Sequence, residues 1–162
     1  MAYYNNYSYS NNYSGSSRKG GGRGQRGYGD QNSMPEPIQA EEIPEDYVDR
    51  AEDVMRRLTG EGSRITTSKI RNLYSMVTDI YNTEILQTGE KLQPDSVTAL
   101  LQLRVRLAYE SGRDESTKKF ISEARLLQYL KGIGDSREKL LRFARYMEAL
   151  VAYHRYFGGR EN

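Results

Sequence analysis

The stretch ITTSKIRNLYSMVTDIYN, residues 65–82, decides the fold class, because its apolar side chains recur at the spacing of one helix face. Those side chains are Ile70, Leu73, Val77, Ile80 and Tyr81. The stretch therefore predicts a helix that begins near residue 67 and ends near residue 86. No later stretch shows the strict alternation of a half-buried strand, and the helical spacing continues through the rest of the chain.

The start of this helix carries the wrong charges for its dipole. Lys69 and Arg71 fall in the first turn and Arg64 precedes it, whereas the macrodipole favours acidic residues there. Three hydroxyl side chains stand at the same end and can cap the free backbone N–H groups. They belong to Thr66, Thr67 and Ser68. Free N–H donors, hydroxyls and cations together suit a bound anion, above all a phosphate.

Four further helices are predicted around this one, each with an apolar stripe and recognisable ends. They cover residues 44–59, 94–111, 114–131 and 135–157, the last with Asp135 as its cap. The helix over 94–111 is apolar around most of its circumference, which predicts a place in the middle of the bundle. The fold is predicted to be all-α, a compact bundle of about five helices over residues 43–162.

Residues 1–42 are predicted to form a disordered, low-complexity basic tail. The first 34 positions hold no Leu, Ile, Val or Phe, and they are rich in Tyr, Asn, Ser, Gly and Arg. Such a composition cannot bury enough apolar surface to fold alone. The tail could add weak, salt-sensitive affinity for RNA, promote self-association or only aid solubility.

The charge is distributed unevenly although the net charge is only +2. Residues 36–53 hold eight acids and one base, whereas residues 64–145 hold fifteen Lys and Arg against ten Asp and Glu. An acidic first helix and a basic remainder predict an asymmetric surface that steers one face toward phosphates or toward a neighbouring subunit.

Several function classes find no support in the residues. There is no Cys and a single His, so no thiolate or histidine metal site is expected, and no cofactor motif occurs. His154 shares a helix face with Phe143 and Met147, which predicts a packed core histidine. No run of about 18 apolar residues occurs, so no membrane span is expected. The chain is predicted to be cytoplasmic and not an enzyme.

Other residues allow a structural and a functional interpretation. Arg104 lies among Leu100, Leu101 and Ala108, so it either forms a buried pair, with Asp79 or Glu110, or contacts a subunit or a phosphate. The loop at 112–119 supplies three cations that either aid solubility or bind RNA. They are Arg113, Lys118 and Lys119.

Two helix faces are equally open to interpretation. A polar, nearly uncharged row on the helix at 67–86 is either a binding surface or a second packed side. It comprises Arg71, Ser75, Thr78 and Asn82. Arg142, Tyr146 and Tyr153 share a flank of the last helix, where tyrosines beside arginine either stack on bases or form the rim of the core.

The segments TTSKIRN at 66–72, YESGR at 109–113, LKGIGDSREKL at 130–140 and FARYMEALVAYHRYFGG at 143–159 resemble one known family. It is the small subunit of the Csm complex, the second Csm subunit of type III-A CRISPR effectors. The resemblance spans about residues 44–159 and leaves the tail out.

The resemblance implies a helical, non-catalytic subunit, present in several copies, that stacks as an inner filament beside the backbone subunits that hold the guide RNA. It also implies a bridge toward the large polymerase-like subunit, and a basic channel in which target RNA pairs with the guide. Lys69, Arg71 and Arg113 match family positions and are the leading RNA-contact candidates. Arg64, Arg104, Lys118 and Lys119 follow on charge and placement.

Such a subunit needs only backbone contacts, because base pairing reads the sequence. Two other classes stay open. In one, the chain is a structural scaffold whose basic residues meet acidic faces of neighbouring copies. In the other, it is a free-standing regulator that docks the helix at 67–86 on DNA.

Overall fold

The computed structural model describes residues 36–60 and 65–159, all within one compact unit that begins at Glu36. Six helices and no strand occur in these two ranges. Their bounds are α1 Tyr47–Gly60, α2 Thr67–Glu84, α3 Pro94–Arg113, α4 Glu115–Glu123, α5 Leu126–Ile133 and α6 Arg137–Tyr156. The all-α prediction is confirmed. Most of the predicted tail, residues 1–35, and the candidate Arg64 lie outside the described residues.

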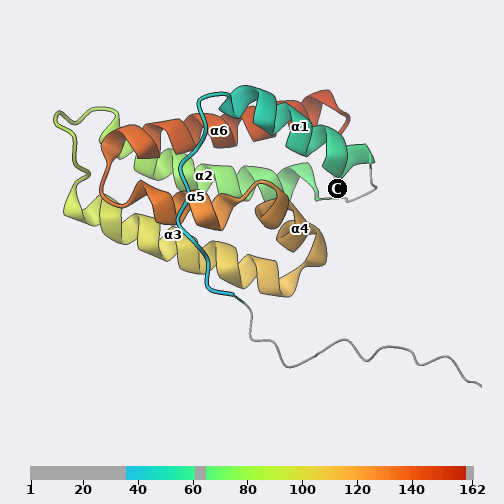
Figure 1. Ribbon diagram of the computed structural model, residues 1–162, viewed down its shortest axis with the longest axis horizontal. Helices are drawn as coiled ribbons and strands as arrows, with labels where there is room; N and C mark the ends of the chain where they lie inside the picture. The colour runs from blue at the N-terminus through green and yellow to red at the C-terminus, as the bar shows by residue number, and fades with distance from the viewer. Residues whose placement is uncertain (1–35, 61–64, 160–162) are drawn as a thin grey trace, which may run out of the picture. The chain divides into compact units, whose positions relative to one another are not determined.

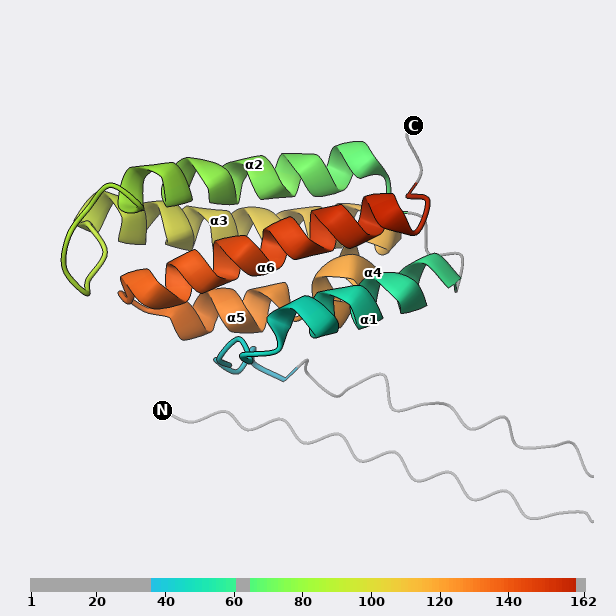
Figure 2. The same ribbon diagram turned by 90° about the horizontal axis from the view of Figure 1, so that it is seen from above.

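α6 is the central helix of the unit. It packs along α1, α2 and α5, and Figure 2 shows it lying between α2 on one side and α1 with α5 on the other. Its inner residues are almost fully buried, namely Leu140, Phe143, Tyr146, Met147 and Leu150. His154 is buried beside them, as predicted, and its Nε2 donates to the carbonyl of Ile65 at 3.0 Å.

α3 is not in the middle of the bundle, and the prediction that placed it there is wrong. It packs on α2, α4 and α5 through Leu100, Leu103 and Leu107, while three large apolar residues stay exposed. The exposed fractions are 52% for Leu101, 70% for Val105 and 55% for Tyr109. Apolar residues on most sides of α3 therefore do not mean that the helix is buried on most sides within this chain.

The single helix predicted over residues 114–131 is two helices. Arg125 interrupts it with φ 53° and ψ 34°, the left-handed region that a non-glycine residue rarely adopts. Two contacts hold the break. The Arg125 guanidinium pairs with Glu41, with Nε 2.6 Å from Oε2, and the Tyr146 hydroxyl donates to the Ala124 carbonyl at 3.2 Å. Tertiary contacts thus divide one predicted helix into α4 and α5, so the described residues form six helices and not five.

The connection between α2 and α3 is fastened to the start of α6 by a buried ion pair. Glu84 is fully buried and Arg137 is 6% exposed, and Arg137 Nε lies 2.8 Å from Glu84 Oε2. The same guanidinium donates to the carbonyls of Gly89 and Lys91. Ser136, and not the predicted Asp135, caps α6 by accepting from the N–H of Lys139.

Candidate functional site

The start of α2 and the end of α3 form a shallow groove, called here the α2–α3 groove. It holds a hollow of about 90 Å³ lined mainly by polar side chains. They are Lys69, Asn72, Arg106, Glu110 and Thr117, with Leu73 and Met76 at the base. Each helix supplies one cation to this hollow, Lys69 from the first turn of α2 and Arg106 from the second half of α3.

The hydroxyls at the start of α2 have different surroundings. The Thr66 side chain is the N-cap and accepts from the N–H of Lys69 at 3.3 Å. Thr67 is buried, and only Ser68 is exposed. Of the three predicted phosphate-binding hydroxyls, Ser68 alone has its side chain directed to solvent.

Lys69 is already paired within the chain. Its Nζ lies 2.9 Å from Oδ2 of Asp114, the N-cap residue of α4. Hydrogen bonds from the hydroxyl of Ser116, then from Lys69, and then from Thr117 hold the pKa of Asp114 well below its usual range. Lys69 is unfavourable at the N-terminus of α2, and its partner Asp114 is favourable at the N-terminus of α4, because a helix dipole attracts negative charge at that end.

Arg71 has a different environment from Lys69. It is exposed, and no ion pair or hydrogen bond joins its side chain to the rest of the described chain. Two residues along a helix are about 200° apart, so Arg71 points away from the α2–α3 groove that Lys69 lines. The two cations cannot contact one phosphate, although they can contact different parts of one RNA.

A second cluster surrounds Tyr109 at the end of α3. The guanidinium carbons of Arg106 and Arg113 lie 5.6 Å and 5.4 Å from the centre of its ring. Both arginines also pair with Glu110, at 2.7 Å and 3.9 Å. Arg113 was predicted as a contact, whereas Arg106 was missed because it falls outside the apolar stripe of α3. Its spacing from Tyr109 and Glu110, at i+3 and i+4, was the available signal.

Arg104 does not form the buried pair that its apolar neighbours suggested. Its side chain is half-buried and makes no ion pair or hydrogen bond with another described residue, and Glu110 is occupied by Arg106 and Arg113. Because α3 lies at the edge of the unit, Arg104 reaches water and needs no internal partner. Arg104 is thus open to water in the isolated unit, and its contact with a subunit or a phosphate stays a prediction.

The other predicted cations lie on α4. Lys118 is exposed, and its Nζ is 3.7 Å from Oε2 of Glu115. Lys119 is half-buried on the next helix position. Thus the structure brings Lys69, Arg106 and Asp114 together, puts Arg113 beside Tyr109, and leaves Arg71 and Arg104 apart from both groups.

The described residues contain no site for a metal ion. No group of three or more His, Cys, Asp or Glu side chains among them could hold one. Within the same residues, no helix has the length and apolar character of a membrane span.

Comparison with known proteins gives a consistent result. The family described as Csm2 Type III-A matches residues 41–160. The protein of Mycobacterium tuberculosis (strain CDC 1551 / Oshkosh) called CRISPR system Cms protein Csm2 is 43% identical over 122 residues, which cover 74% of this chain and 97% of that protein. The protein of the same name from Streptococcus thermophilus is 38% identical over 120 residues, or 72% of this chain and 95% of its own.

Proposed function

Because the chain belongs to the Csm2 family of type III-A CRISPR systems, we propose that it is the non-catalytic small subunit of a cytoplasmic Csm ribonucleoprotein complex. In this proposal several copies stack as an inner filament and help to line the channel for guide and target RNA. They contact the backbone subunits and the polymerase-like large subunit. The complex acts in antiviral defence.

The exposed apolar stripe of α3 carries the proposal. Leu101, Val105 and Tyr109 recur at i, i+4 and i+8 and are each more than half exposed. A free-standing domain of this size rarely leaves such a row in water, whereas a subunit buries it against a neighbour. Arg104, Arg106 and Arg113 stand beside the row, so the surface offers an apolar centre with a basic rim.

A second copy of the chain offers a matching surface. The exposed side of α1 and the residues just before it present Val48 among four exposed acids. These acids are Glu45, Asp46, Asp49 and Asp53. Figure 1 shows α1 and α3 at opposite edges of the unit. Contact between α3 of one copy and α1 of the next would leave a free surface at each end, and such contacts repeat into a row.

One substitution tests this contact. Val105→Glu changes an exposed residue, so the folded unit should keep its helical circular dichroism and melting temperature. Its co-purification with a tagged copy and with the other Csm subunits should be lost. Leu86→Glu is the matched control, because Leu86 is 82% exposed but lies in the α2–α3 connection outside the stripe. Equal co-purification of the parent, Val105→Glu and Leu86→Glu would refute the contact.

The RNA part of the proposal rests on Lys69, Arg71 and Arg113 as contacts with the phosphate backbone. Lys69→Ala with Arg71→Ala should weaken binding by a similar factor for unrelated RNA sequences. It should also lower the salt dependence, by about 0.7 in log–log slope for each lost contact with a single strand. Lys91→Ala with Arg155→Ala removes the same charge from exposed positions outside both proposed surfaces and serves as the control. A double mutant that binds like the parent at low and moderate salt would refute the assignment.

One observation favours a pure scaffold as the second candidate. Lys69, Arg106 and Arg113 are each paired with a carboxylate of their own chain, which reduces the charge that they offer to RNA. Arg71→Glu separates the two candidates. If the complex falls apart before RNA is added, Arg71 serves the subunit contact, and if the complex assembles but binds RNA poorly, Arg71 serves the RNA.

A further inference from the structure

The residues before α1 form a strap, defined here as residues 36–43, that crosses α5 without helix or strand structure (Figure 1). Two hydrogen bonds hold its backbone on α5. The N–H of Glu41 donates to the carbonyl of Gln128 at 3.1 Å, and Lys131 Nζ donates to the carbonyl of Ile38 at 2.8 Å. The strap is thus laid on the helix that carries Gln128 and Lys131.

A glycine of α5 makes this approach possible. A Cβ atom at Gly132 would lie 1.9 Å from the carbonyl oxygen of Glu41. No such contact occurs between unbonded atoms, so any side chain at position 132 has to lift the strap. Gly132 is therefore the position at which α5 leaves room for the backbone of the strap.

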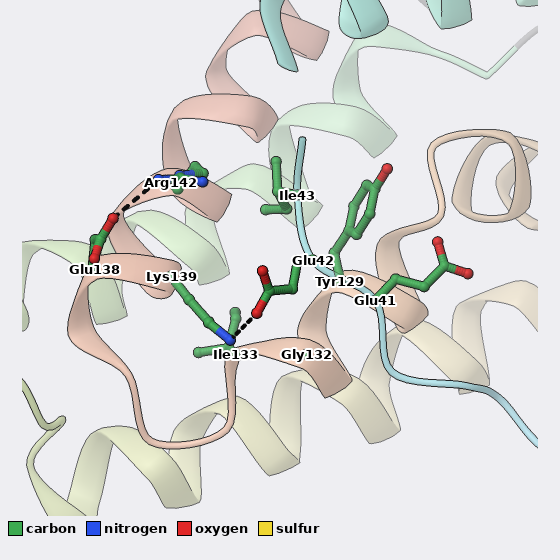
Figure 3. Close-up of a pocket in the computed structure, with 9 residues that line it drawn as sticks. All are labelled: Glu41, Glu42, Ile43, Tyr129, Gly132, Ile133, Glu138, Lys139 and Arg142. Carbon is green, nitrogen blue, oxygen red and sulfur yellow. Dashed lines mark hydrogen bonds and ion pairs between the residues drawn. The ribbon is translucent and has the colours of Figure 1, made fainter. Parts of the chain in front are cut away.

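The strap brings carboxylates onto a basic surface. Glu41 forms a two-point ion pair with Arg125, and Glu42 pairs with Lys139 of α6 (Figure 3). Arg142 and Arg145 continue this surface along α6, and Glu138, paired with Arg142, is an acid of α6 that lines it. Glu45, which follows the strap, lines the same surface together with Arg145. Without the strap, these two acids would stand among five cations that face water. The cations are Arg125, Lys131, Lys139, Arg142 and Arg145.

Two hollows run along the same surface. One, of about 210 Å³, lies between the strap, Tyr129 and Lys139 (Figure 3). The other, of about 450 Å³, is lined by Tyr47 and Arg145. Glu138 and Arg142 line both, so the two hollows adjoin at this ion pair. We name this surface, with its five cations and Tyr47, the α5–α6 trough.

The two ion pairs of the strap are partly open to water. The Glu42 and Lys139 side chains are 74% and 44% exposed, and those of Glu41 and Arg125 are 30% and 41% exposed, so salt and water screen both pairs, the Glu41 pair less than the Glu42 pair. Ile43, in contrast, is 7% exposed and belongs to the core. When residues 36–42 leave the trough, Ile43 holds the chain in place, and the Tyr146–Ala124 hydrogen bond is the contact that still holds the break at Arg125.

We propose that the α5–α6 trough binds the phosphate backbone of single-stranded RNA, and that the acidic strap occupies it in the free protein until RNA displaces the strap. This inference rests on the proposed role in an RNA complex and adds a second surface and its regulation. Phosphates can replace the carboxylates of Glu41 and Glu42, because guanidinium and ammonium groups bind both. Tyr47 lines the trough with a half-buried ring on which a base can stack.

The test uses the full chain with both strap acids neutralised, Glu41→Gln with Glu42→Gln. Removing two competing exposed ion pairs should tighten binding of a single-stranded RNA at low salt by roughly fivefold. The control is Glu90→Gln with Asp95→Asn, which changes the net charge equally at exposed positions of the α2–α3 connection and the start of α3. Lys139→Ala with Arg142→Ala, added to the strap variant, should cancel its gain.

Hydrogen exchange in the parent gives the direct readout of displacement. RNA should speed exchange at the amide of Glu41, which is bonded to Gln128 in the free protein. Equal tightening by the strap and control variants, or a Glu41 amide that stays protected when RNA is bound, would overturn the inference. An acidic peptide that speeds this exchange while RNA does not would overturn it in favour of a protein ligand.

These outcomes are separate from those of the proposed function. The strap variant should still co-purify with the other Csm subunits, because it leaves the α3 stripe intact. If it co-purifies but gains no affinity for RNA over the control, the trough is refuted and the subunit role stands. If it gains affinity but no copy joins a complex, the subunit role fails and the trough stands.

Discussion

The buried pair of Glu84 and Arg137 gives the sharpest test of how this fold is held together. Arg137→Met removes the guanidinium and keeps an unbranched apolar stem in its place. Glu84 then retains the hydrogen bond from the N–H of Gln93, at 3.0 Å to its Oε1, but loses its counter-charge while its side chain is fully buried. The carbonyls of Gly89 and Lys91, which Arg137 also satisfies, belong to exposed residues that water can reach.

The expected cost is about 3–5 kcal/mol, the range for a buried pair that loses one member. That is a large part of a typical domain stability of about 5–15 kcal/mol. The cost should also depend on pH. In the parent, burial raises the pKa of Glu84, but hydrogen bonds from Ser96, Gln93 and Arg137 outweigh it, and the pKa is lowered. Its carboxylate therefore stabilises the fold above the unfolded pKa of about 4.3, and that stability is lost as pH falls through the folded pKa.

Arg137→Met weakens this dependence. Without the guanidinium, only the hydrogen bonds from Ser96 and Gln93 oppose the effect of burial, so the pKa of Glu84 is higher in the variant than in the parent. The cost of the substitution is therefore largest at pH 7 and smaller near pH 4. Glu84→Gln together with Arg137→Met removes the buried charge and should recover part of the loss.

Urea unfolding followed by circular dichroism at the two pH values measures both effects. The control is Arg142→Met, because Arg142 pairs with the exposed Glu138 and its loss should cost less than about 1 kcal/mol. A cost below about 1 kcal/mol for Arg137→Met at pH 7, or an equal cost at both pH values, would refute the reasoning.

Three further substitutions probe other contacts. Burial lowers the pKa of His154, so the fold favours its neutral form, and the free energy of unfolding should fall as pH drops below about 6.5. His154→Gln should reduce this dependence of the melting temperature on pH, and an unchanged dependence would contradict the prediction. Gly132→Ala should lift the strap and speed amide exchange at Glu41 without melting the helices, so a protected amide would contradict the close approach. Asp114→Ala removes the cap of α4 and the partner of Lys69, and it should lower the free energy of unfolding in urea by about 1 kcal/mol. Asp114→Asn keeps a capping side chain and should lower it less, so equal losses for the two variants would argue against the capping role.

Local patterns were enough to predict most helices. The stripe of α2 and its start at Thr67 are as predicted, because a capping hydroxyl and a 3.6-residue period are both written in consecutive residues. The same holds for Pro94 at the start of α3 and for His154 in the core. Each of these features depends on neighbours within a few positions of the chain.

The break at Arg125 could not be predicted in this way. Residues 122–125, Ser-Glu-Ala-Arg, include neither Gly nor Pro, and a left-handed arginine is unfavourable on local grounds. The carboxylate that holds Arg125 comes from Glu41, 84 residues away, and the hydroxyl that binds the Ala124 carbonyl comes from Tyr146. Long-range contacts therefore override the helical pattern there. For the same reason, the strap over residues 36–42 was assigned to the tail, although it packs on α5.

The apolar pattern of α3 illustrates a different limit. Periodicity reports that a side chain is apolar, but it does not report whether the same chain or another chain covers it. Leu101 and Val105 look like core residues in the sequence, and they lie in water with Tyr109 in the isolated unit. A cation raises the same problem, because Lys69 was singled out as unpaired on its own helix while Asp114 stands 2.9 Å away across the fold.

The two proposed RNA surfaces share a property that bears on how the protein would work. Lys69 pairs with Asp114 in the α2–α3 groove, and Arg125 and Lys139 pair with Glu41 and Glu42 in the α5–α6 trough. RNA has to displace carboxylates from these cations, so the net gain for each contact is small and falls with salt. One copy should therefore bind RNA weakly. If copies stack along one RNA, as proposed, each contact raises the effective concentration for the next, and the row binds far more tightly than its members. Internal ion pairs would then restrict RNA binding to the assembled complex.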